Sequence, residues 1–199
     1  MLTLYDDAIS GNGYKARLLL HQLDRPYELI ELDILKAETR TPEFLAINPN
    51  GRIPTLKLDD GRCLSESNAI LFYLAEGSAY LPSDPFERAK ALQWMFFEQY
   101  SHEPFIATSR FLRLHREQTP DVLVDLERRR SGGEAALEVM QQHLETHEFF
   151  VANSYSIADI ALFAYTQVAG EGGFDVAPYP AIVAWLDRVR AQPRFVAMG

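Results

Sequence analysis

The sequence predicts a two-domain fold, in which an α/β domain with a mixed sheet is followed by an all-helical domain. Short strand and helix patterns alternate over the first part of the chain, a proline-rich segment interrupts them, and only helical periodicity follows. The length of 199 residues suits one large domain or two small ones. We expect domains at residues 1–77 and 86–199, joined by a linker at 78–85.

Apolar patterning predicts the first three elements. Residues 2–5 are typical of a short strand, and the apolar stripe along 13–23 is typical of a helix that packs on a core. Pro26 ends this helix, and residues 27–32 follow as a second strand. Strand–helix–strand units of this kind favour a sheet with helices on its faces.

Turn and capping residues predict the remaining elements of the first domain. Thr41 can cap a helix that begins at Pro42, because proline suits the first helical position. Residues 54–58 and 62–64 are expected to pair as a hairpin, and 65–75 to form a third helix. The expected order is therefore β-α-β-α-β-β-α, in a mixed sheet.

The second domain is expected to contain helices only. Apolar faces mark four helical stretches, at 92–100, 137–144, 156–168 and 180–191. Pro104 lies within otherwise helical sequence and should kink or break a helix there. Gly132-Gly133 is a second weak point, since each glycine costs about 1 kcal/mol relative to alanine in a helix interior.

Composition and charge argue against several classes of protein. The formal net charge is −9 and no long basic run occurs, so we expect no nucleic-acid partner. No apolar run is long enough to cross a membrane and no signal peptide is recognisable, so we expect a cytoplasmic protein with no membrane partner. Cys63 is the single cysteine, which excludes an intramolecular disulfide and a multi-cysteine zinc site, and we expect no metal.

One candidate binding motif is Arg52-Ile53-Pro54-Thr55-Leu56, where a proline opens a strand. A strand-edge proline would explain this pattern, because no ladder hydrogen bond is lost there. A cis Ile53–Pro54 bond would explain it too, and would expose the backbone N–H and C=O of Ile53 to a bound peptide. Both interpretations remain open from this motif alone.

A second candidate motif is Ser65-Glu66-Ser67-Asn68, where a strand end leads into a helix. Helix N-termini present free N–H groups that bind carboxylates, and Ser67 adds a hydroxyl donor. Glu66 adds an anion that could hold an ammonium group, so the pair suits an α-amino acid, which carries both charges. Ordinary capping of the helix start is the alternative.

Together the two motifs resemble the glutathione-binding half of the cytosolic glutathione S-transferases. The similarity covers residues 48–56 and 65–70 and continues into the helical half. There Ser156-Ile157-Ala158-Asp159 resembles the family's buried capping box, and residues 179–195 resemble its final helix. The resemblance implies a thioredoxin-like first domain, an all-α second domain, a homodimer, and glutathione as co-substrate.

The resemblance also implies roles for individual residues. The backbone of Ile53, before a cis Pro54, would pair with the cysteinyl part of glutathione. Glu66 and Ser67 would hold its γ-glutamyl end. Arg52 either helps to hold the glycyl carboxylate or is a solvated surface arginine.

A transferase must stabilise the thiolate of glutathione, because a free thiol with a pKa of about 8.5 is mostly protonated near neutral pH. The run Ser10-Gly11-Asn12-Gly13 resembles the bacterial Nu-type members, which have Thr-Pro-Asn before the glycine. The resemblance implies that Ser10 and Asn12 donate hydrogen bonds to the sulfur, aided by the helix dipole. The alternatives are that Ser10 is only a helix cap, or that Tyr5 is the donor.

Aromatic side chains in the helical domain suit a cleft for an apolar second substrate. Tyr100 and Phe105 flank the break expected at Pro104, where a helix could open, and are the candidate second-substrate residues. Most of the other aromatic side chains must belong to the core.

Three functions fit these observations. The first is a homodimeric glutathione transferase that conjugates glutathione to an apolar electrophile. The second is a glutathione-dependent disulfide or peroxide reductase on the same fold, in which two glutathiones supply both sulfurs. The third is a non-catalytic binding module, against which the intact Ile53-Pro54 and Glu66-Ser67 motifs argue.

Overall fold

The computed structural model describes residues 1–198 and divides into two compact units. Met1–Ser78 and the C-terminal segment from Pro193 form the first unit, and Ala79–Gln192 form the second. The C-terminal segment is tied to the first unit by polar contacts. The hydroxyl of Tyr14 donates to the carbonyl of Val196 at 2.7 Å, and Arg194 forms an ion pair with Asp24.

The first unit contains a four-stranded mixed sheet with the order β2-β1-β3-β4. Strand β1 runs parallel to β2 and antiparallel to β3, which in turn is antiparallel to β4. The predicted order of elements and the mixed sheet are confirmed. The strands are β1 (Leu2–Asp6), β2 (Tyr27–Glu31), β3 (Thr55–Lys57) and β4 (Cys63–Ser65).

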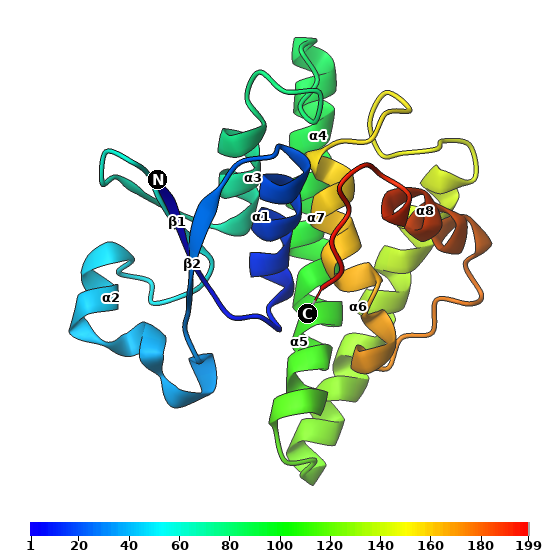
Figure 1. Ribbon diagram of the computed structural model, residues 1–199. Helices are drawn as coiled ribbons and strands as arrows, with labels where there is room; N and C mark the ends of the chain where they lie inside the picture. Colours follow the sequence, from blue (N-terminus) through cyan, green and yellow to red (C-terminus); the bar gives the residue numbers. More distant parts are fainter. Residues whose placement is uncertain (199) are drawn as a thin grey trace. The chain divides into compact units, whose positions relative to one another are not determined.

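Helices lie on both faces of this sheet (Figure 1). Helices α1 (Gly11–Gln22) and α3 (Ser67–Ala75) pack together on one face, and α2 (Pro42–Ile47) lies on the other, after the short turns η1 (Ile34–Lys36) and η2 (Glu38–Arg40). Successive side chains of β1 point to opposite faces of the sheet. Leu4 and Asp6 are buried on one face. On the other face the Tyr5 ring packs on Phe44 of α2, with ring centroids 5.8 Å apart.

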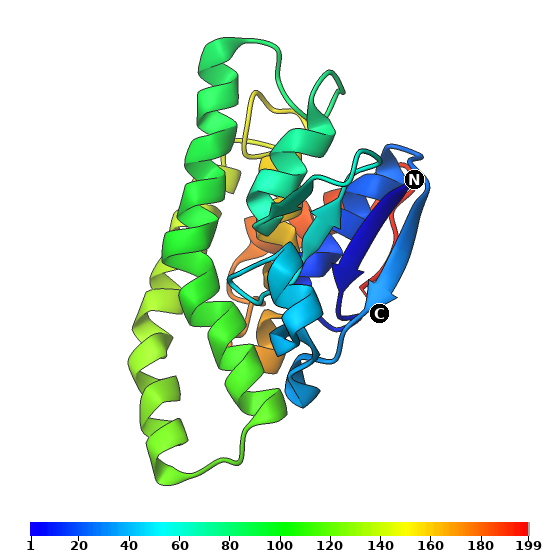
Figure 2. The same ribbon diagram turned by 90° about the vertical axis from the view of Figure 1, so that its left-hand side faces the viewer.

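The second unit is helical, as predicted. Helix α4, a π-helical turn η3 and helix α5 follow one another as a long rod, and α6 returns antiparallel beside α5 (Figure 2). Pro104 occupies the first turn of α5, so the expected interruption takes the form of the π turn before it. The elements are α4 (Pro85–Phe97), η3 (Glu98–His102), α5 (Glu103–His115), α6 (Pro120–Leu144), α7 (Ile157–Thr166), η4 (Ala169–Gly172) and α8 (Pro180–Arg190).

Helix α6 is continuous through Gly132 and Gly133, the pair at which the sequence suggested a weak point. A Cβ atom at Gly132 would lie 2.3 Å from the Phe105 ring, and one at Gly133 would lie 2.2 Å from the Phe174 ring. The two glycines therefore give two aromatic rings room to pack directly on the helix backbone. This packing offsets the low helix propensity of glycine.

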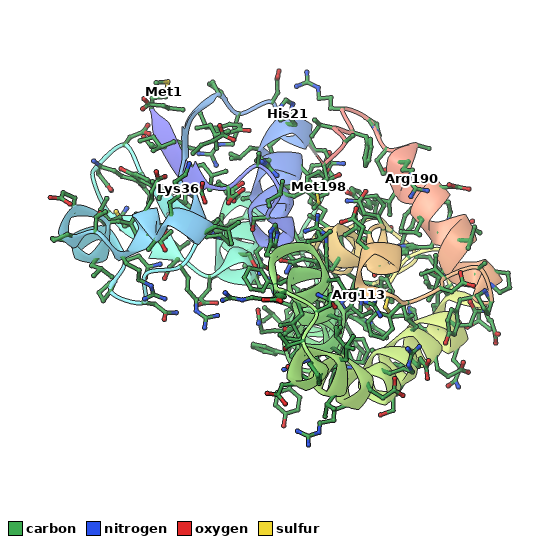
Figure 3. The ribbon with its side chains drawn as sticks, turned by 90° about the horizontal axis from the view of Figure 1, so that it is seen from below. Met1, His21, Lys36, Arg113, Arg190 and Met198 are labelled. Carbon is green, nitrogen blue, oxygen red and sulfur yellow. The ribbon has the colours of Figure 1, made fainter. Side chains whose placement is uncertain are left out.

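The turn η4 is held against α5 by two arginines of that helix. Arg113, labelled in Figure 3, donates through Nε to the carbonyl of Gly172 at 3.1 Å. Arg110 forms an ion pair with Glu171 at 2.6 Å.

Among residues 1–198, no helix combines the length and apolar character needed to cross a membrane.

A buried capping box begins α7, as the sequence predicts. Ser156 Oγ accepts from the N–H of Ala158 at 3.3 Å, and Asp159 accepts from the N–H of Ser156 at 2.9 Å. Asp159 also accepts from the N–H of Phe150 and from the indole N–H of Trp185 in α8. Burial raises the pKa of Asp159 to about 6, and the hydrogen bonds from Trp185, Ser156 and Phe150 oppose this rise. This carboxylate joins the start of α7 to the preceding loop and to α8.

We expect Asp159→Ala to destabilise the second unit by about 4 kcal/mol, because three buried N–H groups lose their acceptor and each such loss costs about 1–3 kcal/mol. Both tryptophans, Trp94 and Trp185, belong to this unit, so urea unfolding followed by tryptophan fluorescence reports on it. Ser156→Ala is the control and should cost about 1 kcal/mol, since it removes a capping hydroxyl. Equal losses for the two variants would contradict the bridging role of Asp159.

Candidate active site

The loop between α2 and β3 is shaped by one buried side chain and contains a cis peptide bond. Asn48 Nδ2 donates to the carbonyl of Arg52 at 2.8 Å and to Thr55 Oγ1 at 3.1 Å. The Ile53–Pro54 bond is cis, in agreement with one of the two interpretations of this motif. Among the described residues, no hydrogen bond engages the backbone N–H or C=O of Ile53. These two groups are therefore open to a ligand that pairs as a strand would.

Glu66 has a backbone conformation that residues other than glycine rarely adopt. Its φ of 70° and ψ of 115° occur at the junction of β4 and α3. Such conformations persist only where the surrounding structure imposes them, and they cluster at ligand sites. The side chain is exposed, and within the described part of the chain its carboxylate has no hydrogen-bond or ion-pair partner. Glu66 thus presents an open anion next to the first-turn N–H groups of α3.

A buried polar network joins the start of α3 to the start of α1. Ser67 Oγ donates to Asn12 Oδ1 at 3.0 Å, and Lys15 Nζ donates to the same oxygen at 2.8 Å. Lys15 Nζ also lies 3.4 Å from Ser67 Oγ. Because an ammonium group can only donate, the amide oxygen of Asn12 must be the atom that faces Lys15. The amide NH₂ group of Asn12 therefore points away from Lys15 and Ser67.

Lys15 belongs to this site but was not predicted as a site residue. The available signal was its spacing, since it follows Asn12 by three residues and so shares a face of α1. Its side chain is fully buried, which is rare for lysine. The network thus places a positive charge between two helix N-termini, which carry partial positive charge themselves. This arrangement favours an anionic ligand.

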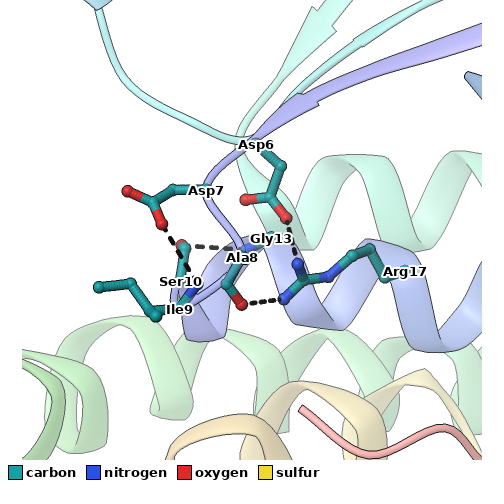
Figure 4. A network of polar contacts seen from close by, with 7 residues as sticks. All are labelled: Asp6, Asp7, Ala8, Ile9, Ser10, Gly13 and Arg17. Carbon is teal, nitrogen blue, oxygen red and sulfur yellow. Dashed lines mark hydrogen bonds and ion pairs between the residues drawn. The ribbon is translucent and has the colours of Figure 1, made fainter. Parts of the chain in front are cut away.

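Ser10 is the N-cap of α1, because its Oγ accepts from the N–H of Gly13 at 3.2 Å (Figure 4). The cap uses a lone pair of the hydroxyl group. The hydroxyl hydrogen is not needed for the cap, so Ser10 can cap the helix and still donate to a ligand. Ser10 therefore does cap the helix, as one interpretation expected, and capping leaves its hydroxyl hydrogen able to donate to a ligand.

The other predicted site residues lie in different surroundings. The Tyr5 ring packs on Phe44, on the sheet face that bears α2. The Arg52 side chain is exposed and has no polar partner among residues 1–198. In the second unit, Tyr100 is 85% exposed within the π turn, whereas the ring of Phe105 packs on α6.

The polar side chains at the starts of α1 and α3 differ in kind from thiols and from the usual metal ligands. Cys63 is exposed on β4, an edge strand, and is a free thiol. The described part of the chain contains no group of three or more His, Cys, Asp or Glu side chains suited to a metal ion. The polar groups brought together at α1 and α3 are hydroxyl, amide and ammonium groups, which act as hydrogen-bond donors and as a fixed charge.

Comparisons with known proteins match both units of the chain. Residues 1–76 match the family model of the glutathione S-transferase N-terminal domain, and residues 104–193 match that of the C-terminal domain. The disulfide-bond oxidoreductase YfcG of Escherichia coli (strain K12) is 34% identical over 200 residues, covering 97% of this chain and 92% of that protein.

Solved structures agree with these matches. A glutathione S-transferase from Pseudomonas fluorescens has a TM-score of 0.97 and 51% identity, covering 99% of this chain and 98% of its own. A glutathione transferase from Burkholderia graminis has a TM-score of 0.85 and 28% identity, covering 97% of this chain and 85% of its own. That structure was solved with two glutathione molecules bound per protein subunit.

Proposed function

The chain belongs to the glutathione S-transferase family, and from this premise we propose that it binds glutathione in its first unit and transfers the thiolate to an apolar electrophile. The supporting observation is the open hydrogen-bonding capacity of Ile53 and Glu66, each in an uncommon backbone geometry. The Ile53 backbone pairs with the cysteinyl part of glutathione. Glu66 holds its ammonium group, while the backbone N–H of Ser67 and the other first-turn N–H groups of α3 hold the γ-glutamyl carboxylate.

Ser10 and Asn12 activate the thiol in this proposal. The Ser10 hydroxyl and the Asn12 amide donate to the sulfur, and the α1 dipole and the Lys15 charge add positive potential. Lowering the thiol pKa by one unit requires about 1.4 kcal/mol of preferential stabilisation, which one or two hydrogen bonds to an anion can supply. We place the chain with the Nu-type bacterial members on this arrangement. The packing of Tyr5 on Phe44 supports a structural role for the rival donor.

The proposed reaction is a substitution at carbon. The ionised sulfur attacks an electrophilic carbon and forms a C–S bond, and the leaving group departs with the electron pair of the broken bond. The thiol proton is released to solvent when the thiolate forms. Tyr100 and Phe105 remain the proposed residues for the apolar substrate, and we propose a cytoplasmic homodimer as the working state.

Disulfide reduction is a second candidate function, favoured by two relatives. The Escherichia coli relative is named a disulfide-bond oxidoreductase, and the Burkholderia graminis structure holds two glutathione molecules per subunit. One glutathione thiolate attacks the substrate disulfide, forming a mixed disulfide and releasing one substrate thiolate. The second attacks the mixed disulfide, giving oxidised glutathione and the other substrate thiolate. No protein cysteine is needed, which suits a chain whose single cysteine lies on an edge strand.

A parallel turnover assay decides between these functions. The purified protein is given glutathione with chlorodinitrobenzene in one arm, and with hydroxyethyl disulfide and a recycling system in the other. We expect faster conjugation in the first arm. Faster disulfide reduction would assign the reductase activity to the same site. No turnover in either arm, with no glutathione binding by calorimetry, would contradict both and leave a binding module on this fold.

Ser10→Ala is expected to lower kcat about tenfold and to raise the kinetic pKa of the bound thiol by about one unit, because a donor to the thiolate is lost. Ser10→Gly separates this role from capping, since glycine at an N-cap costs only about a few tenths of a kcal/mol. Ser10→Thr keeps the hydroxyl and should retain activity. Unchanged pH–rate profiles for both Ser10→Ala and Ser10→Gly would move the role to Asn12 or Tyr5.

Glu66→Gln is expected to raise the KM for glutathione about tenfold with little change in kcat, because Glu66 contacts the end of the ligand that does not react. Glu28→Gln is the matched control, an exposed glutamate on β2 at the opposite edge of the sheet. Initial rates over a glutathione concentration series measure both constants. If the two variants shifted KM equally, Glu66 would have no specific role in binding.

A further inference from the structure

A buried carboxylate lies directly beneath the first turn of α1. Asp6, the last residue of β1, is fully buried on the sheet face that bears α1 and α3. A Cβ atom built on Gly13 would lie 1.5 Å from Asp6 Oδ1, so even a methyl group at this position would overlap the carboxylate. Gly13 is therefore required by close approach, and the helix that bears Ser10 and Asn12 rests on the Asp6 side chain.

Arg17, in the second turn of α1, joins this carboxylate to the loop before the helix. Its Nη1 lies 3.4 Å from Asp6 Oδ2, and its Nη2 donates to the carbonyl of Ala8 at 2.8 Å (Figure 4). One guanidinium thus spans the strand end, the loop and the helix. A planar guanidinium can make both contacts at fixed separation, which a single ammonium group cannot.

The same loop is held by Asp7 at its other side. The N–H of Ile9 donates to Asp7 Oδ1 at 3.2 Å, and the N–H of Ser10 donates to the Asp7 carbonyl at 2.9 Å. The course of the chain from Asp6 to Ser10 is therefore defined by two interactions, the Asp7 turn and the Arg17 bridge (Figure 4). If the Arg17 contacts were lost, the hydrogen bonds to Asp7 would still form the turn, but the guanidinium would no longer hold the turn in place against α1.

We propose that Asp6 and Arg17 form a buried positioning pair that holds the β1–α1 loop in place, so that Ser10 and Asn12 meet the glutathione sulfur. This inference rests on the proposed function of the site. Neither residue touches the ligand. Their effect passes through the backbone of the loop and the first turn of α1, where a displacement of about 1 Å can cost up to about 100-fold in rate.

The pair is sensitive to pH in the neutral range. Burial raises the pKa of Asp6 to about 7, the Arg17 guanidinium and the N–H of Asp7 oppose the rise, and the carboxylates of Asp7 and Glu31 add to it. Tyr27 of β2 also faces the pair, and its own pKa is raised, mainly by burial. Protonation of Asp6 removes its attraction for Arg17. Thiol activation should therefore weaken as the pH falls below about 7.

The effect on stability has the opposite sign. The pKa of Asp6 is raised from 3.8 to about 7 on folding, so the folded form binds more protons than the unfolded form between these pH values. The contribution of Asp6 to the free energy of unfolding therefore falls as the pH rises through this window. Ionised Asp6 therefore lowers the free energy of unfolding above pH 7, while its attraction for Arg17 holds the loop in position.

Asp6→Asn tests the pair because it keeps the shape of the side chain and the contact with Gly13. At pH 8 we expect kcat to fall about tenfold with little change in the KM for glutathione, and the pH–rate profile to keep the ionisation of the bound thiol but to lose the second ionisation near pH 7. Arg17→Lys should cause a similar fall, and the double variant should fall no further than the singles. Glu31→Gln, at an exposed neighbour on β2, is the matched control; it should retain the wild-type rate at pH 8 and move the Asp6 ionisation slightly to lower pH, because the Glu31 carboxylate raises the pKa of Asp6.

Two measurements without glutathione separate this inference from the proposed function. Backbone amide NMR signals of residues 7–13 should titrate with a midpoint at about pH 7 in the wild-type protein and not in Asp6→Asn. The free energy of unfolding of the wild-type protein, relative to Asp6→Asn, should fall between pH 5 and pH 8. No loop titration, or an unchanged pH–rate profile in Asp6→Asn, would overturn the positioning role. A loop that titrates in a wild-type protein without turnover would overturn the proposed function alone.

Discussion

The contact between the N-terminal ends of α1 and α3 is the interaction on which the rest of the site depends. The contact is made by Ser67, Asn12 and Lys15. Lys15 can only donate, so the amide oxygen of Asn12 accepts from both Lys15 and Ser67. Packing of α1 on α3 brings the two helix starts together, and this polar contact sets the orientation of their donor and acceptor groups. Buried polar networks specify geometry in this way because a half-satisfied network is costly.

Beneath this contact lies a second polar layer, formed by Asp6, Arg17 and the close approach at Gly13. The two layers differ in chemistry. The upper layer consists of neutral donors and one ammonium group, which suits an anionic sulfur and a carboxylate. The lower layer contains a carboxylate whose burial is unfavourable when it is ionised, so its function must be sought in the position of the loop above it.

The second unit also depends on hydrogen bonds to one buried carboxylate. Asp159 collects hydrogen bonds from Ser156, Phe150 and Trp185, and so defines where α7 starts relative to α8. Apolar packing then completes the unit, as Gly132 and Gly133 show by admitting Phe105 and Phe174 to the backbone of α6. In both units a buried carboxylate fixes a helix start, and close packing around it leaves little freedom.

The sequence alone determined the order of the elements, the helix starts at Thr41-Pro42 and Ser156, and the motifs around Pro54 and Glu66. These are local properties, set by turn chemistry, capping and apolar period, and so they can be read over a few residues. The tertiary structure alone decided the burial of Lys15, the continuity of α6 through its glycines, and the pairing of Asp6 with Arg17. Each of these depends on what another segment places beside the residue. A lysine, a glycine pair or an aspartate has no such partner in the sequence until folding brings distant residues into contact.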